Sequence, residues 1–91
     1  MLCSIQNEFG EVLDVFPMPR TGMSAEVVAS ELGALLSDIV GRNGVRDVPL
    51  HDSKTGQKQD RVVVDIDPWS GPQEAKLLRV YEAIGSLALP E

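Results

Sequence analysis

The chain is short of the residues on which small enzymes and secreted proteins rely. Its 91 residues include one cysteine, Cys3, and one histidine, His51. A single cysteine excludes an internal disulfide framework and fits a reducing compartment, so we expect a cytoplasmic protein. The sequence has no apolar run long enough to span a membrane, and its first residues lack the charged and apolar regions of a signal peptide.

Basic residues are also scarce. Eight Lys and Arg stand against fourteen Asp and Glu, for a net charge of −6. This charge opposes a nucleic-acid backbone and an anionic membrane surface, so we expect neither as a direct partner. The only basic segment is 42–61, which has five basic and three acidic residues.

The composition that remains is that of an ordinary globular protein, with 43% hydrophobic and 24% charged residues. This balance lets the chain bury a core and argues against disorder along its whole length. Because a chain of this length forms one core of modest size, we expect residues 1–91 to be a single domain without a deep active-site cleft.

The clearest pattern is an amphipathic helix, which we predict over 25–40. Ser24 is suited to cap its first turn, and Glu26 lies where the helix dipole favours an acid. The apolar residues that recur at helical spacing are Val28, Leu32, Leu35, Leu36, Ile39 and Val40. One face of this helix must therefore be buried. Gly41 and Gly44 are residues of the type that commonly ends a helix.

Two short strands precede this helix. The alternating segments 2–6 and 11–16 are joined by the turn sequence Asn7-Glu8-Phe9-Gly10, which is typical of a hairpin. The expected core face carries Cys3, Ile5, Leu13 and Val15. The opposite face is then expected to carry Leu2, Ser4, Gln6, Val12, Asp14 and Phe16.

A second hairpin follows the helix. We predict 45–50 as an edge strand, because Pro49 cannot donate a hydrogen bond to a neighbouring strand. The polar stretch 51–58 is its connection, and 59–67 is the strongest strand pattern in the chain, which we expect at the centre of the sheet. On that strand one face carries Val62, Val64 and Ile66, and the other carries Val63, Asp65 and Asp67.

The remaining residues predict a second helix. We expect it to begin at the capping-box spacing of Ser70 and Gln73 and to end near Gly85. Two amphipathic helices suffice to cover one side of a small sheet. We therefore predict an α+β two-layer sandwich in the order ββαββα, with four mostly antiparallel strands and two helices on one face.

Motifs for chemistry are incomplete. Asp65 and Asp67 point the same way from one strand, with Cα atoms roughly 6.5 to 7 Å apart, so with His51 they form a candidate divalent-cation site. Two carboxylates are not a complete ligand set, and an acid just before a helix also stabilises its N-terminus. We expect no catalytic residues, no metal site and no cofactor, with a small metal-assisted enzyme as the alternative.

The sheet face that two helices leave uncovered is the candidate binding surface. It is expected to mix apolar groups, which supply burial, with carboxylates, which select a basic partner. Trp69, the only tryptophan, lies at a strand-to-helix corner where it can plug the core or anchor a partner. The residues expected to bind the partner are Val12, Asp14, Phe16, Val63, Asp65, Asp67 and Trp69, with Phe16 as the apolar anchor.

These patterns favour a non-enzymatic interaction module: an accessory subunit, an adaptor or an inhibitor that occupies a partner's surface. The expected partner is another protein with a basic surface, or a second copy of the chain. Phage-encoded acidic inhibitors, whose carboxylates imitate a nucleic-acid backbone, offer an analogy. A self-assembling structural component is a further alternative.

Overall fold

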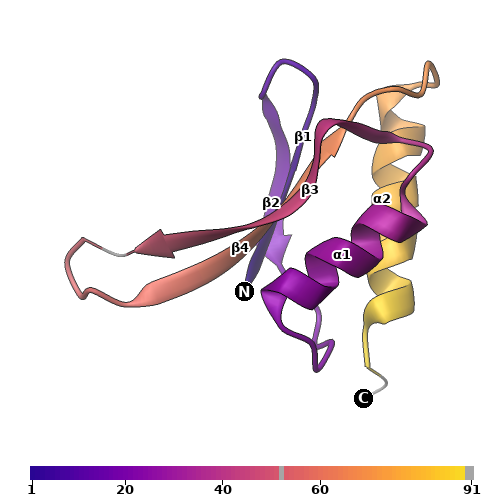
Figure 1. Ribbon diagram of the computed structural model, residues 1–91. Coiled ribbons are helices and arrows are strands. Elements are labelled where there is room, and N and C mark those ends of the chain that lie inside the picture. Colours follow the sequence, from indigo (N-terminus) through magenta and orange to yellow (C-terminus); the bar gives the residue numbers. More distant parts are fainter. Residues whose placement is uncertain (52, 90–91) are drawn as a thin grey trace.

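A four-stranded mixed sheet carries two helices in the computed structural model, which describes residues 1–51 and 53–89. The elements in chain order are β1 (Leu2–Gln6), β2 (Val12–Pro17), α1 (Ala25–Leu35), β3 (Val40–His51), β4 (Lys58–Ile66) and α2 (Gln73–Leu87). Both helices lie on the same side of the sheet (Figure 1). The predicted α+β two-layer architecture in ββαββα order is therefore confirmed.

The strands lie in the order β2-β1-β4-β3, so β1 and β4 are central and β3 is an edge, as predicted. The pairs β1–β2 and β3–β4 are antiparallel, whereas the central pair β1–β4 is parallel. A parallel pair needs a long crossover, and here the crossover includes β2, α1 and β3. The carboxyl ends of the two central strands consequently meet at one end of the sheet.

The hydrophobic core lies between the sheet and the two helices. Its sheet side is formed by Cys3, Ile5, Val62, Val64 and Ile66. Its helix side is formed by Ala25, Val28, Ala29, Leu32, Leu36, Ile39, Val80, Ala83 and Ile84. Alternate residues of β4 thus pack under the helices, as the period of two predicts.

The first helix begins where predicted and ends earlier. Ser24 is the N-cap, and its Oγ accepts a hydrogen bond from the N–H of Val27 at 3.3 Å. The helix ends at Leu35, and the C-cap Leu36 closes the following turn by accepting the N–H groups of Ile39 and Val40 at 2.9 and 2.8 Å. Val40, which was predicted to be helical, is instead the first residue of β3.

The second helix differs from its prediction at both ends. Its N-cap is Pro72, which makes no side-chain capping bond, so the capping box predicted at Ser70 is wrong. The Pro72 carbonyl accepts the N–H groups of Ala75 and Lys76 instead. The helix also continues past Gly85 to Leu87.

The register of the β1–β2 hairpin is also different. Asp14 pairs with Ile5 and Phe16 with Cys3, so both residues of β2 lie on the helix-facing side. The pairing shifts within the hairpin, and Leu13 is the additional residue of a β-bulge. Because one inserted residue reverses the alternation of side chains, the placement of Asp14 and Phe16 on the uncovered face is wrong.

Contacts with α2 hold both side chains on the helix-facing side. The ring centroids of Phe16 and Tyr81 are 5.7 Å apart, and the Tyr81 hydroxyl donates a hydrogen bond to Asp14. This hydrogen bond raises the pKa of Tyr81 to about 12. Val15, which was expected in the core, pairs with Ser4 on the uncovered side.

A larger bulge interrupts β3. Val40 pairs with Ile66 and Val45 with Val64, so the four residues between them on β3 stand opposite Asp65 alone. Val40, before the bulge, and Val45, after it, therefore both face the helices, although one number is even and the other odd. Beyond the bulge the side chains of β3 alternate in the opposite phase.

The Asp65 side chain fills the space inside this bulge. Its Oδ2 accepts the N–H of Asn43 at 2.8 Å, and the residue is 1% exposed. Gly41 makes the fit sterically feasible, because a Cβ at this position would lie 2.9 Å from Cγ and Oδ2 of Asp65. The Asp65 side chain and the bulge of β3 thus fit each other in shape and are joined by a hydrogen bond.

Truncation of the buried side of α1 should destabilise the fold. We expect Leu32→Ala or Leu36→Ala to lower the free energy of unfolding by about 2–5 kcal/mol, because each side chain is fully buried. Glu31→Ala, at an exposed position, should have little effect. Urea denaturation measures all three variants, and equal losses would contradict the assigned buried face.

Two glycines provide a matched test of the bulge. We expect Gly41→Ala to destabilise the protein by about 1–3 kcal/mol through the contact with Asp65. Gly85→Ala should instead stabilise it by about 0.5–1 kcal/mol, because no atom lies within 4 Å of the added Cβ and alanine favours the helix. Thermal denaturation checks both. If the Gly41→Ala penalty persisted in an Asp65→Ala background, this contact would not be its cause.

Candidate functional site

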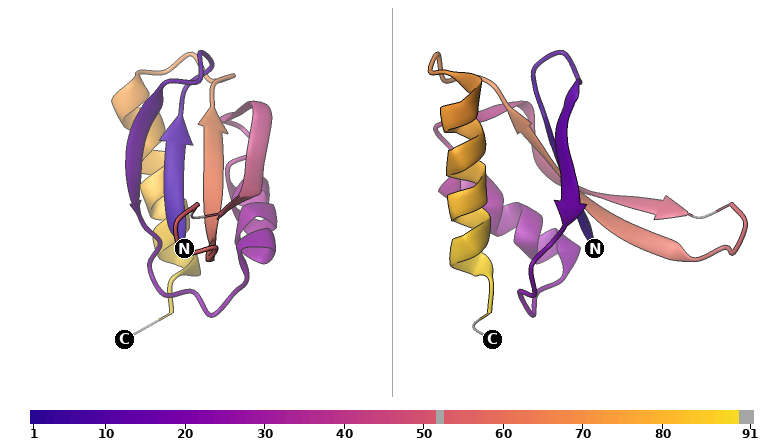
Figure 2. Two further views of the ribbon diagram at one scale, coloured as in Figure 1. Left: turned by 90° about the vertical axis from the view of Figure 1, so that its left-hand side faces the viewer. Right: turned by 180° about the vertical axis from the view of Figure 1, so that it is seen from behind.

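We use the name open face for the side of the sheet away from the helices. Strand pairing places on it Leu2, Ser4, Gln6, Val12, Val15, Pro17, Arg46, Val48, Leu50, Gln59, Arg61, Val63 and Asp65. The left view of Figure 2 looks onto this face, with both helices behind the strands. No element of the described chain covers it.

Apolar side chains are exposed on the two flanks of the open face. On β2, Val12 is 57% and Val15 45% exposed, and on β3 Leu50 is 37% exposed. In the middle of the face Ser4 and Val63 are buried between their neighbours, although no helix covers them. Contact with a partner would therefore involve the flanks more than the centre.

Residues 49–51 and 53–60 extend beyond the other strands as a two-stranded arm. Within the arm β3 and β4 pair only with each other, because the pairing of β1 with β4 begins at Arg61. Figures 1 and 2 show the arm projecting from the sheet on the side opposite the helices. The open face consequently lies on the inside of the bend, and Val48 and Leu50 continue it outward.

Two arginines, Arg46 and Arg61, lie on the open face next to the apolar groups. Both are half-buried. The one hydrogen bond of the Arg46 side chain is a long contact of 3.5 Å to the carbonyl of Asn43. The Arg61 guanidinium forms no hydrogen bond or ion pair with the residues described, and its Nε is covered without a partner.

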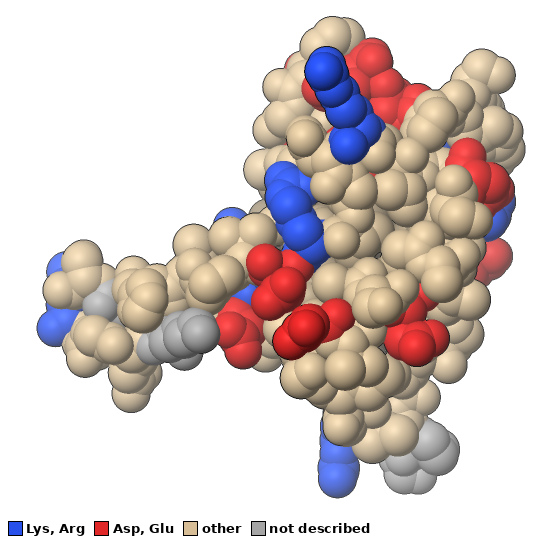
Figure 3. Space-filling view, in the orientation of Figure 1, with Lys and Arg blue, Asp and Glu red and all other residues tan. Residues whose placement is uncertain are grey.

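Two other basic side chains, among the residues described, pair with carboxylates. Arg79 donates two hydrogen bonds to Asp38, at 2.8 and 2.9 Å, and lowers the pKa of that carboxyl group. The Lys76 Nζ lies 3.6 Å from Asp67 Oδ1. Figure 3 shows basic and acidic side chains side by side on the surface seen there. Among the residues described, Arg20 and Arg42 also have no carboxylate partner, so the lack of one at Arg61 is not a property confined to the open face.

The acids predicted for the open face are not exposed on it. Asp14 faces the helices, Asp65 is buried in the bulge, and Asp67 lies beyond the end of β4 beside Lys76. Among the described residues the open face therefore carries arginines and no exposed carboxylate. The expectation of a basic partner rested on those acids and loses its basis.

The sequence analysis identified both arginines only as members of the basic segment 42–61 and did not place them on the open face. Arg61 could have been found, because it precedes Val63 by two residues on the same strand. Arg46 could not, because the alternation of β3 changes phase at a bulge that no local signal marks. Of the other predicted contacts, Val12 is exposed on the open face, whereas Val63 is 7% exposed and offers little area.

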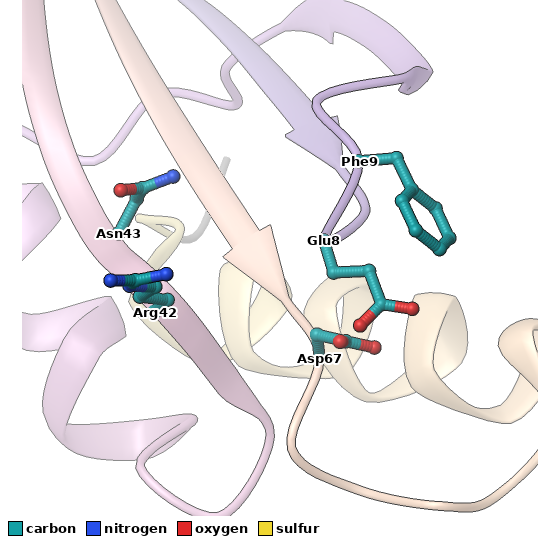
Figure 4. Close-up of a pocket in the computed structure, with 5 residues that line it drawn as sticks. All are labelled: Glu8, Phe9, Arg42, Asn43 and Asp67. Carbon is teal, nitrogen blue, oxygen red and sulfur yellow. The ribbon is translucent and has the colours of Figure 1, made fainter.

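A polar hollow of about 590 Å³ lies where the central strands end (Figure 4). Its lining residues are Glu8, Phe9, Arg42, Asn43 and Asp67. The hairpin turn supplies Glu8 and Phe9, the β3 bulge supplies Arg42 and Asn43, and Asp67 follows β4. In Figure 4 the carboxyl groups of Glu8 and Asp67 point toward each other. Sheets with parallel strands commonly bind ligands at such ends.

The carboxyl groups of Glu8 and Asp67 lie close together in the hollow. A hydrogen bond to Asp67 raises the pKa of Glu8, and the ammonium of Lys76 opposes this shift. A carboxyl group with a raised pKa in the folded state contributes stability at acid pH and loses it as the pH rises through that pKa. When both groups are ionised, the two carboxylates repel each other.

We expect Glu8→Gln to relieve this repulsion, because an amide donates to Asp67 at every pH. The variant should unfold at a higher urea concentration than the wild type, with a larger gain at about pH 7 than at about pH 4. Urea midpoints at both pH values check this. A gain that is the same at both would mean that Glu8 and Asp67 do not interact.

The candidate cation ligands do not converge. The Asp65 carboxylate is enclosed by the bulge, and His51 pairs with Lys58, seven residues along β4 from Asp65, or about 23 Å. Among the residues described, no group of three or more acidic, histidine or cysteine side chains is placed to hold a metal ion. Burial raises the pKa of the Cys3 thiol to about 12, so this thiol stays protonated at neutral pH.

Trp69 lies in the connection between β4 and α2, beyond the paired residues of β4. Its ring packs closely on the backbone of Gly71, where a Cβ would lie 3.1 Å from the ring atom Cε2. It is 37% exposed. Trp69 is therefore not part of the open face.

No protein-family model matches the chain, and comparison with curated proteins and with solved structures finds no significant match. In the part of the chain that the structure describes, no helix is long and apolar enough to cross a membrane.

Proposed function

We propose that this chain is a non-enzymatic protein-interaction module that binds another protein, or a second copy of itself, through the open face. Within this class it acts as an accessory subunit, an adaptor or an inhibitor by occupying its partner's surface. The single observation that carries the proposal is an uncovered sheet face with exposed apolar flanks beside two arginines that have no carboxylate partner among the residues described.

The physical basis is the combination of burial and polarity. Exposed valine and leucine side chains gain about 25 cal/mol for each Å² of apolar area that a partner covers. Arginine is enriched at interfaces because it combines a long apolar stem with directional hydrogen bonding. A cytoplasmic location is part of the proposal, supported by a lone cysteine that is buried as a thiol.

The alternative of a metal-assisted enzyme has less support. It needs Asp65 and Asp67 to share a cation, yet the Asp65 carboxylate lies inside the bulge and Asp67 contacts Lys76 and Glu8. A carboxylate that is 1% exposed offers no open coordination position to a substrate-bound ion.

Substitution at Val15 tests the proposed function. A tagged chain is used to capture proteins from the source cell, and the captured proteins are identified by mass spectrometry. We expect a partner recovered with the wild type to be lost with Val15→Arg, because a charge then stands in the apolar flank of the interface. Sedimentation analysis of the same variants detects a second copy as the partner.

Leu78→Arg is the matched control, because Leu78 is 57% exposed on α2, on the other side of the sheet. It should keep the partner, and both variants should retain the circular dichroism spectrum of the wild type. Equal capture by the two variants, or no specific capture and no self-association of the wild type, would contradict the proposed function.

A further inference from the structure

We infer that the partner of the open face is an acidic, amphipathic segment of another protein, whose carboxylates bind Arg46 and Arg61. This inference rests on the proposed function and specifies the chemistry of its partner. It reverses the polarity expected from composition, because an acidic protein would here present a basic binding surface.

Arg46 and Arg61 are the basic groups of the open face. Among the residues described, Arg79 is the one arginine with a carboxylate partner, and Arg46 and Arg61 differ from the other arginines in lying on the open face beside apolar groups. The Nε of Arg61 is covered, which leaves the outer guanidinium nitrogens to receive a ligand. A guanidinium binds a carboxylate through two parallel hydrogen bonds, with charge added to directionality.

The residues next to the two arginines supply apolar surface. Strand pairing places Val15, Ser4, Val63 and Arg46 in one row across the sheet. The row thus runs from an exposed apolar flank to a basic flank, and Val48 beside Arg61 adds apolar surface on the inside of the bend. A segment with leucine-like residues on one side and glutamate-like residues beside them complements this order.

A second copy of the chain complements it poorly. Two open faces packed against each other would bring four arginines together without an exposed carboxylate on either face. The net charge of −6 on each copy adds repulsion at longer range. A nucleic acid would supply phosphates to the arginines, but its backbone leaves the apolar flanks unfilled.

The test measures binding of defined probes by fluorescence anisotropy. The probe is a labelled synthetic peptide of glutamate and leucine with amphipathic helical spacing, and the control peptide has lysine in place of glutamate. We expect the acidic peptide to bind the wild type and the basic peptide not to bind. Arg46→Glu and Arg61→Glu should each weaken binding about tenfold or more, because a like charge replaces each contact.

Arg20→Glu is the matched control, since it changes the net charge equally at an exposed loop residue outside the open face. It should leave the affinity within about twofold, apart from the screened long-range contribution. Circular dichroism confirms that the variants are folded. If Arg61→Glu unfolds the protein, Arg46→Glu decides the outcome, because its side chain makes only the long contact to Asn43.

Four results would overturn the inference. They are no binding of the acidic peptide, an equal loss of affinity with Arg20→Glu, equally tight and arginine-dependent binding of an oligothymidylate, and self-association of the chain that Val15→Arg abolishes. The proposed function fails separately. A captured partner that Val15→Arg loses and Arg46→Glu retains would leave the interaction module in place and refute only the acidic chemistry.

Discussion

The difference between the two faces of the sheet depends on the contact between the Asp65 carboxylate and the bulge of β3. The carboxylate accepts the Asn43 N–H at 2.8 Å and occupies the volume that the missing side chain of Gly41 leaves free. Because the bulge reverses the alternation of β3, Val40 and Val45 both face the helices. Without it, Arg46 would point into the space between sheet and helices, where a charge is costly.

A smaller bulge performs the same task on the other edge of the sheet. The additional Leu13 turns Asp14 and Phe16 toward α2, where both contact Tyr81, and turns Val15 outward. Both edge strands are thus irregular, while the central parallel pair is regular. The bulges place Asp14 on the helix side and bury Asp65. The open face of this acidic chain therefore carries arginines and exposed valines.

Local signals in the sequence account for the parts of the fold that were predicted correctly. The N-cap Ser24, the hairpin turn at Asn7 and the valine alternation of β4 each depend on neighbours in sequence, and all three are present in the structure. Asn7 Oδ1, for example, accepts the N–H groups of Phe9 and Glu11 and so holds the turn. The order of elements follows from these signals alone.

Registers could not be predicted in the same way. Leu13 and the β3 bulge are set by contacts between residues far apart in sequence, such as Asp14 with Tyr81 and Asp65 with Asn43. A single shift moves every later side chain to the other face, which is why the expected anchor Phe16 lies on the helix side.

The burial of Cys3 between the sheet and the helices has a practical consequence. Cys3 lies on a central strand beneath both helices, so a thiol reagent reaches it only when the core opens, and its modification rate reports global rather than local unfolding.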